Sequence, residues 1–117
     1  MGVLPPVEMF FALVIAHALC DYPLQGDFLA RAKNHTAPIP GVPWQQALAA
    51  HSAIHAGAVW LITGYWSLAV CELVFHAIID NAKCRGLIGF NADQILHVAL
   101  KAVYVALIVY RPEWLVS

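Results

Sequence analysis

Residues 44–83 read WQQALAAHSAIHAGAVWLITGYWSLAVCELVFHAIIDNAK, and this stretch decides the fold. Two apolar segments, 44–63 and 65–83, stand on either side of a single glycine, Gly64. Each segment has the length of roughly 20 residues that a helix needs to cross the apolar core of a bilayer. Because so short a turn leaves its two helices antiparallel and adjacent, the stretch predicts a helical hairpin.

Further apolar segments lie on both sides of this hairpin. The first begins after Pro5 and ends at Pro23, and proline suits the start of a helix and stops one that reaches it later. The last begins after Asn91, and Asn91 and Gln94 have the spacing of an N-terminal capping box. We therefore predict an all-α fold in one domain, residues 1–117: a four-helix transmembrane bundle with a short interfacial helix in the first loop. The predicted spans are 6–22, 44–63, 65–83 and 92–110, and the interfacial helix falls within 26–33.

The composition favours lipid as the surrounding solvent. The chain is 62% hydrophobic and 11% charged, with a mean hydropathy of +0.71, whereas soluble domains carry about 25% charged residues. A net charge of −1 without a basic stripe gives no reason to expect nucleic acid as a partner. Three cysteines without a CxxC pair suggest neither a zinc ribbon nor a disulfide framework. The expected partner is the lipid bilayer, and a homo-oligomer is left open.

Basic residues in the loops predict the orientation. Arg31, Lys33, Lys83 and Arg85 lie in the first and third connections, and Arg111 lies on the opposite side. Because cytoplasmic loops carry an excess of lysine and arginine, the first and third loops are expected in the cytoplasm and both termini outside.

Pairs of polar residues four apart recur in all four predicted spans. Residues at this spacing share one face of a helix, so two such side chains can bind one metal ion. Antiparallel threading brings every pair to the membrane face where the first and third loops lie. The pairs are His17 and Asp21, His51 and His55, His76 and Asp80, and Asp93 and His97.

These eight side chains are the predicted metal ligands. Singly, each has a plainer interpretation, since a lone buried histidine is usually a hydrogen-bonded core residue and an aspartate often lies at a helix end. Together they are costly in a membrane unless they face a polar interior or a partner. Because they exceed the three or four protein ligands of a zinc ion, we predict one or two divalent transition-metal ions, with zinc first and iron as the alternative.

Other polar residues suggest supporting roles. Asp21 or Asp93 is a candidate general base, and Lys83 is a candidate clamp for an anionic substrate. Lys101 lies deeper in its span, which favours an internal salt bridge. Glu72 comes one helix turn before the histidine of the third span and is a candidate for a carboxylate that orients it.

Several of these strings resemble one family. HALCDYPLQ at 17–25, ARAKN at 30–34, IDNAK at 79–83 and the DQxxH string at 93–97 are similar to the domain of unknown function 3307 family. The resemblance covers nearly the whole chain and implies a small, multi-pass membrane protein of bacteria or bacteriophages, without an assigned activity. Combined with the orientation expected from the loop charges, this implies the bacterial inner membrane, with both termini in the periplasm. The chain also resembles, more loosely, membrane-bound metal-dependent hydrolases, and this resemblance implies a hydrolase activity.

Three functions follow as hypotheses. The first is a metal-dependent hydrolase of a lipid or phosphoester, in which a metal-bound water attacks the substrate. The alternative is a non-enzymatic phage or bacterial membrane protein whose histidines and aspartates form a structural polar network. A second alternative is a di-iron redox enzyme, because iron also accepts imidazole ligands.

Overall fold

The computed structural model describes residues 4–117, and within this range the chain forms five α-helices and no strand. The expectation of an all-α fold is confirmed. Helix α1 covers Pro6–Asp21, and the short helix α2 in the first loop covers Gly26–Ala32. The other helices are α3 (Trp44–Thr63), α4 (Trp66–Cys84) and α5 (Phe90–Tyr110).

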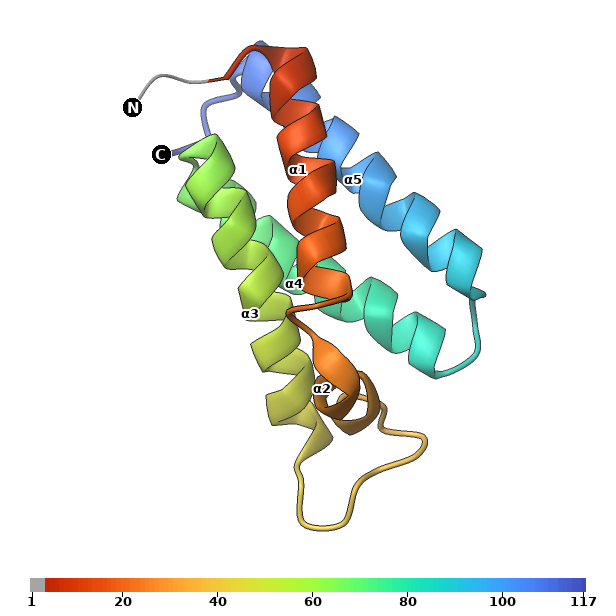
Figure 1. The fold of residues 1–117 in the computed structure, drawn as a ribbon. Coiled ribbons are helices and arrows are strands. Elements are labelled where there is room, and N and C mark those ends of the chain that lie inside the picture. The colour runs from red at the N-terminus through yellow and green to blue at the C-terminus, as the bar shows by residue number, and fades with distance from the viewer. Residues whose placement is uncertain (1–3) are drawn as a thin grey trace.

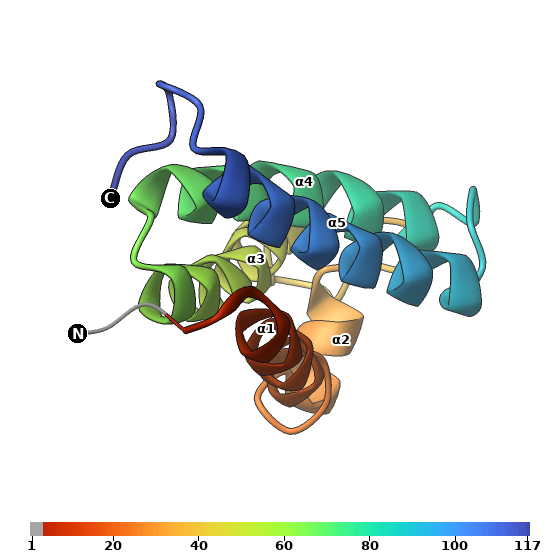
Figure 2. The same ribbon diagram turned by 90° about the horizontal axis from the view of Figure 1, so that it is seen from above.

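The four long helices form a closed ring around one interior (Figures 1 and 2). Helices α3 and α4 make the predicted hairpin, because Gly64 ends α3 in the left-handed conformation, with φ of 76°. Helix α1 packs against α3 and α5, and α4 closes the ring against α5. Helix α2 packs against α3 at the end where the first loop lies, while the start of α1 and the end of α5 lie at the opposite end.

One sequence prediction about a helix end is wrong. Asn91 does not cap α5, because the helix begins two residues earlier than predicted, at Phe90, with Gly89 at the N-cap and no side-chain cap. The chain reverses direction at Gly86, whose φ is 76°. Gly89 has an extended backbone, and the helix begins directly after it, with the first helical hydrogen bond from Asp93 N–H to Gly89 O. The Gln94 side chain therefore does not take part in a capping box.

Large apolar side chains lie on the outside of the bundle and ionisable side chains lie inside it, the opposite of their distribution in soluble proteins. Helix α1 exposes a stripe of large apolar residues, Val7, Phe11 and Ile15, each at 60% or more. The interior instead contains histidines, acids and two lysines, most of them 0–2% exposed. An apolar core of Met9, Leu13, Val59, Leu68, Tyr104 and Ile108 fills the end of the bundle near the chain termini. The polar interior occupies the half near the first and third loops.

Among the described helices, α5 alone is long and apolar enough to cross a membrane, judged by length and composition. Helices α1 and α2 reach that standard only as a pair, and they are bent by 83° relative to each other. Helix α1 has 16 residues, and α3 and α4 carry the histidines and acids that lower their hydropathy. The crossing of a membrane by four helices stays a prediction.

Candidate metal centre

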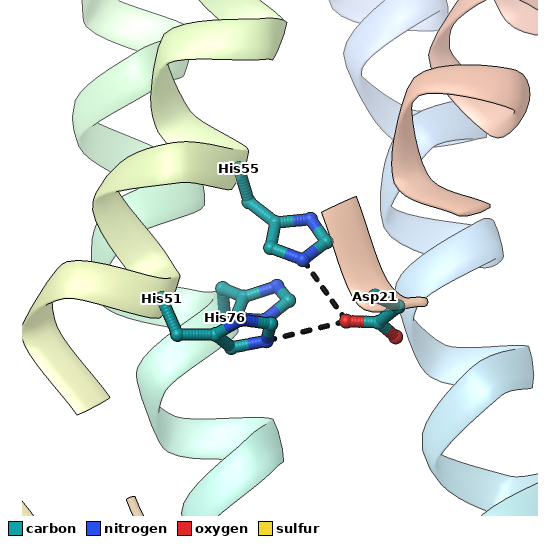
Figure 3. Close-up of side chains that lie close together, drawn as sticks. All are labelled: Asp21, His51, His55 and His76. Carbon is teal, nitrogen blue, oxygen red and sulfur yellow. Dashed lines mark hydrogen bonds and ion pairs between the residues drawn. The ribbon is translucent and has the colours of Figure 1, made fainter. Parts of the chain in front are cut away.

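Four side chains from three helices converge in the polar interior. Asp21 comes from α1, His51 and His55 from α3, and His76 from α4 (Figure 3). Their ligand atoms all lie within 4.8 Å of one another. We call this set, Asp21, His51, His55 and His76, the inner-face cluster.

Asp21 holds the inner-face cluster together. Its Oδ1 accepts a hydrogen bond from His55 Nε2 at 2.9 Å and lies 3.2 Å from His51 Nε2 (Figure 3). The ring of His76 stacks on that of His55, with 3.8 Å between centroids. The three histidines are 0–1% exposed. Helical geometry explains the convergence, because His51 and His55 are four residues apart on one face of α3.

The second oxygen of Asp21 is fixed by neighbours. Gln94 Nε2 donates to Asp21 Oδ2 at 3.0 Å, and His17 Nε2 lies 3.3 Å from the same oxygen and donates to Gln94 Oε1 at 3.1 Å. Asp21 is thereby oriented with Oδ1 toward the histidines. Gln94 was missed as a site residue, although it stands inside the DQxxH string that carries two predicted ligands.

A second group, which we call the deep cluster, consists of Glu72, His76 and His97, with ligand atoms also within 4.8 Å of one another. His76 Nδ1 lies 3.3 Å from Glu72 Oε1, and the ring of His97 stacks on His76 with 4.3 Å between centroids. His76 therefore belongs to both clusters.

Two residues hold Glu72 in the deep cluster. Lys101 Nζ donates to its Oε1 at 2.6 Å, and Tyr104 OH donates to its Oε2 at 2.8 Å. The internal salt bridge predicted for Lys101 is confirmed. Tyr104 gave no signal in the sequence, because an aromatic residue in an apolar helix is usually part of the core.

The remaining predicted ligands have other partners. Asp80 Oδ2 lies 2.6 Å from the buried Lys33 Nζ and 3.5 Å from His51 Nε2, so this carboxylate is already paired with a cation. Asp93 lies beside His97, with 3.3 Å between Oδ1 and Nε2. Lys83 is partly exposed and lies about as near to Asp80 as to Asp93, at 3.8 and 4.0 Å.

The donor set fits a transition metal. Within residues 4–117, buried ring nitrogens of five histidines have no hydrogen-bond partner, and four of these histidines lie in the polar interior: His17 (Nδ1), His51 (Nδ1 and Nε2), His76 (Nε2) and His97 (Nδ1); the fifth is His35 (Nδ1) in the first loop. An unsatisfied buried polar group costs about 1–3 kcal/mol, so several in one place favour a bound cation. Imidazole nitrogen and carboxylate oxygen are the usual zinc ligands outside cysteine sites.

A pocket of about 300 Å³ connects the inner-face cluster to the surface beside the first and third loops. Its wall includes Asp21, Asp27, Lys83, Phe90 and Gln94. Asp21 is thus shared between the cluster and the pocket, whereas Asp93 does not line the pocket. A small polar or anionic group that enters here meets Asp21 before it meets any histidine.

The comparisons with known proteins assign a family. The family model described as "Protein of unknown function (DUF3307)" matches residues 9–116, and the chain belongs to this family. No curated protein and no solved structure matches the chain.

Proposed function

We propose that this chain is a four-span membrane protein whose inner-face cluster binds zinc and hydrolyses a phosphoester or a lipid ester at the cytoplasmic face. The observation that carries the proposal is the convergence of three buried histidines and one carboxylate from three helices, with the carboxylate, Asp21, also on the wall of a surface pocket. Hydropathy and helix packing do not require such a convergence.

The inverted side-chain distribution supports the membrane setting. Large apolar side chains on the outside and ionisable ones inside suit lipid as the solvent, because ionisable groups in a membrane face the bundle interior. An even number of spans also agrees with the start of α1 and the end of α5 at the same end of the bundle (Figure 1). The positive-inside rule then puts α2 and the pocket on the cytoplasmic side of a bacterial inner membrane, with both termini in the periplasm.

The histidines are the proposed zinc ligands. His51, His55 and His76 supply three imidazoles, which leaves one position of a tetrahedral ion for water, as catalytic zinc sites require. A zinc ion lowers the pKa of its bound water to about 7 and polarises a phosphoryl or carbonyl oxygen.

Asp21, rather than Asp93, is the proposed general base. Asp21 lines the pocket and contacts two of the proposed ligand histidines, and Gln94 and His17 hold its other oxygen. Lys83, also on the pocket wall, is the proposed clamp for an anionic substrate. An attacking water would therefore lie between the ion and Asp21, on the side from which substrate enters.

Metal analysis of the full chain in detergent tests the proposal. We expect at least one equivalent of zinc, and less than about a tenth of an equivalent of any transition metal after gentle purification would refute it. His55→Ala should lose metal. His35→Ala, which removes a histidine of the first loop that lies outside both clusters, should keep it.

Hydrolysis of bis(p-nitrophenyl) phosphate separates binding from catalysis. Asp21→Asn should retain the zinc, because the three histidines remain, but should lose about 10²-fold or more in rate, as the removal of a general base does. A rate unchanged in Asp21→Asn, with metal bound, would refute the assignment of the base.

A structural polar network is the second candidate. The ion pairs Lys33–Asp80 and Lys101–Glu72 favour it, because each neutralises a buried acid without a metal. On this hypothesis a chelator leaves the melting temperature unchanged, whereas zinc at 100 times its Kd should add about 2.7 kcal/mol of stability if the metal centre is real.

A further inference from the structure

The deep cluster contains metal-ligand chemistry that the inner-face cluster does not use. A single zinc ion on His51, His55 and His76 Nε2 leaves Glu72, His76 Nδ1 and His97 without a metal. All three residues are 0–1% exposed, and their ligand atoms lie within 4.8 Å of one another. A water-filled setting does not explain these groups, because each is enclosed by the bundle.

We propose that Glu72, His76 and His97 form a second metal site, joined to the first through the imidazole ring of His76. The inference rests on the proposed metal centre and extends it to two ions. The class of ligand is a divalent transition metal that accepts nitrogen and carboxylate donors, such as Zn²⁺, Co²⁺ or Cu²⁺.

His76 has the geometry of a bridge. Its Nδ1 lies 3.3 Å from Glu72 Oε1, in the deep cluster, and its Nε2 lies 4.0 Å from Asp80 Oδ2, on the side of the inner-face cluster. Nε2 has no hydrogen-bond partner within the described residues. Both ring nitrogens can therefore bind a metal if His76 gives up the proton on Nδ1, which now lies between Nδ1 and Glu72.

His97 is oriented as a ligand. Its Nε2 lies 3.3 Å from Asp93 Oδ1, and a carboxylate at one ring nitrogen favours the tautomer with the proton there. Nδ1 is then the unprotonated atom, and no group in residues 4–117 forms a hydrogen bond with it. Asp93 thus acts on this site as a positioning residue.

Lys101 indicates that a cation is stabilised at the deep cluster. Its ammonium group is 1% exposed and lies 2.6 Å from Glu72 Oε1, the oxygen that also faces His76. Tyr104 holds Oε2, so Oε1 can change its partner while the carboxylate keeps its place. A divalent ion would displace Lys101 from Oε1. In the absence of metal, the ammonium group of Lys101 neutralises the charge of the Glu72 carboxylate and so competes with the metal for it.

The simpler interpretation is that Glu72 only orients His76 as a ligand of the first ion. That role explains the contact between Glu72 and His76. It does not explain the unpartnered Nδ1 of His97 or the stacking of His97 on His76. The second site explains both.

The test is metal stoichiometry and electron paramagnetic resonance of the full chain in detergent, titrated with Zn²⁺ or Cu²⁺ alone. The parent should bind two equivalents, and His97→Ala and Glu72→Gln should each bind one. Lys101→Met should bind the second equivalent at least about tenfold more tightly, since a competing charge is gone. Two Cu²⁺ ions bridged by His76 should be magnetically coupled, which weakens the signal, and His97→Ala should restore the signal of one isolated ion.

The outcomes separate the two proposals. A parent that binds one equivalent, with Glu72→Gln only weakening it about 10–100-fold, would overturn the second site in favour of the orienting role and leave the proposed function standing. A parent that binds no metal would overturn both. His97→Ala that fails to fold does not decide the matter, because Glu72→Gln and Lys101→Met report on the same site.

Discussion

Lys101→Met is expected to destabilise the metal-free protein strongly. The variant keeps the length of the side chain and removes its charge, so Glu72 remains buried without its cation. Removal of one partner from a buried ion pair costs about 3–5 kcal/mol. Glu72 retains its contacts with Tyr104 and His76, which places the expected loss near the lower value, about 3 kcal/mol. That loss is a more than 100-fold change in the unfolding equilibrium.

The assay is reversible unfolding in detergent with a chelator present, followed by circular dichroism. The matched control is the double variant Glu72→Gln/Lys101→Met, in which no charge is left and Tyr104 can still donate to the glutamine carbonyl. It should fall within about 1 kcal/mol of the parent, since a buried pair replaced by neutral groups is nearly neutral in stability. A single variant that loses less than about 1 kcal/mol, or a double variant as unstable as the single, would refute this account.

Other predictions concern separate parts of the bundle. Lys33→Met should lower the free energy of unfolding by about 3 kcal/mol, because it removes the nearest cation from the buried Asp80 and leaves only the partly exposed Lys83, 3.8 Å away; a chemical-denaturation curve measures this. Leu68→Ala, in the apolar core, should cost about 2–5 kcal/mol in the same assay, while zinc content stays unchanged. Bound zinc should be released as the pH falls, because protons compete with the ion for the imidazole nitrogens, and equilibrium dialysis from neutral to acidic pH would show it. In a cysteine-free chain in inverted vesicles, Gly41→Cys should react with an impermeant maleimide and Ser117→Cys should not; the reverse pattern would contradict the orientation.

The helices were predictable because their ends are local features. Pro43, Gly64 and Pro112 limit where a helix can begin or continue, and each acts through its own backbone. The start of α5 was predicted wrongly, because Asn91 and Gln94 have the spacing of a capping box, whereas the turn at Gly86 and the extended Gly89 let the helix begin at Phe90.

The partners of the site residues were less predictable than their helix faces. Spacing on a helix brings His51 and His55 to one face, but the choice of their partner depends on how the neighbouring helices are rotated. Gln94 illustrates this, because its amide joins α5 to Asp21 on α1. The pairing of Lys33 with Asp80 also depends on how α2 packs against the bundle. The spacing of residues within one helix does not predict this packing.

The charge of the interior connects the two proposed ions to the lysines. Four carboxylates face two buried lysines, which leaves two negative charges in the interior and at its boundary with the pocket; the carboxylates are Asp21, on the pocket wall, and the buried Glu72, Asp80 and Asp93, and the lysines are Lys33 and Lys101. Buried charge needs compensation of this kind, and one Zn²⁺ ion supplies it. A second ion would leave two excess positive charges. Loss of one proton from the bridging His76 and of one from a metal-bound water removes both, so the two-ion centre is neutral only in the state that contains a bridge and a hydroxide nucleophile.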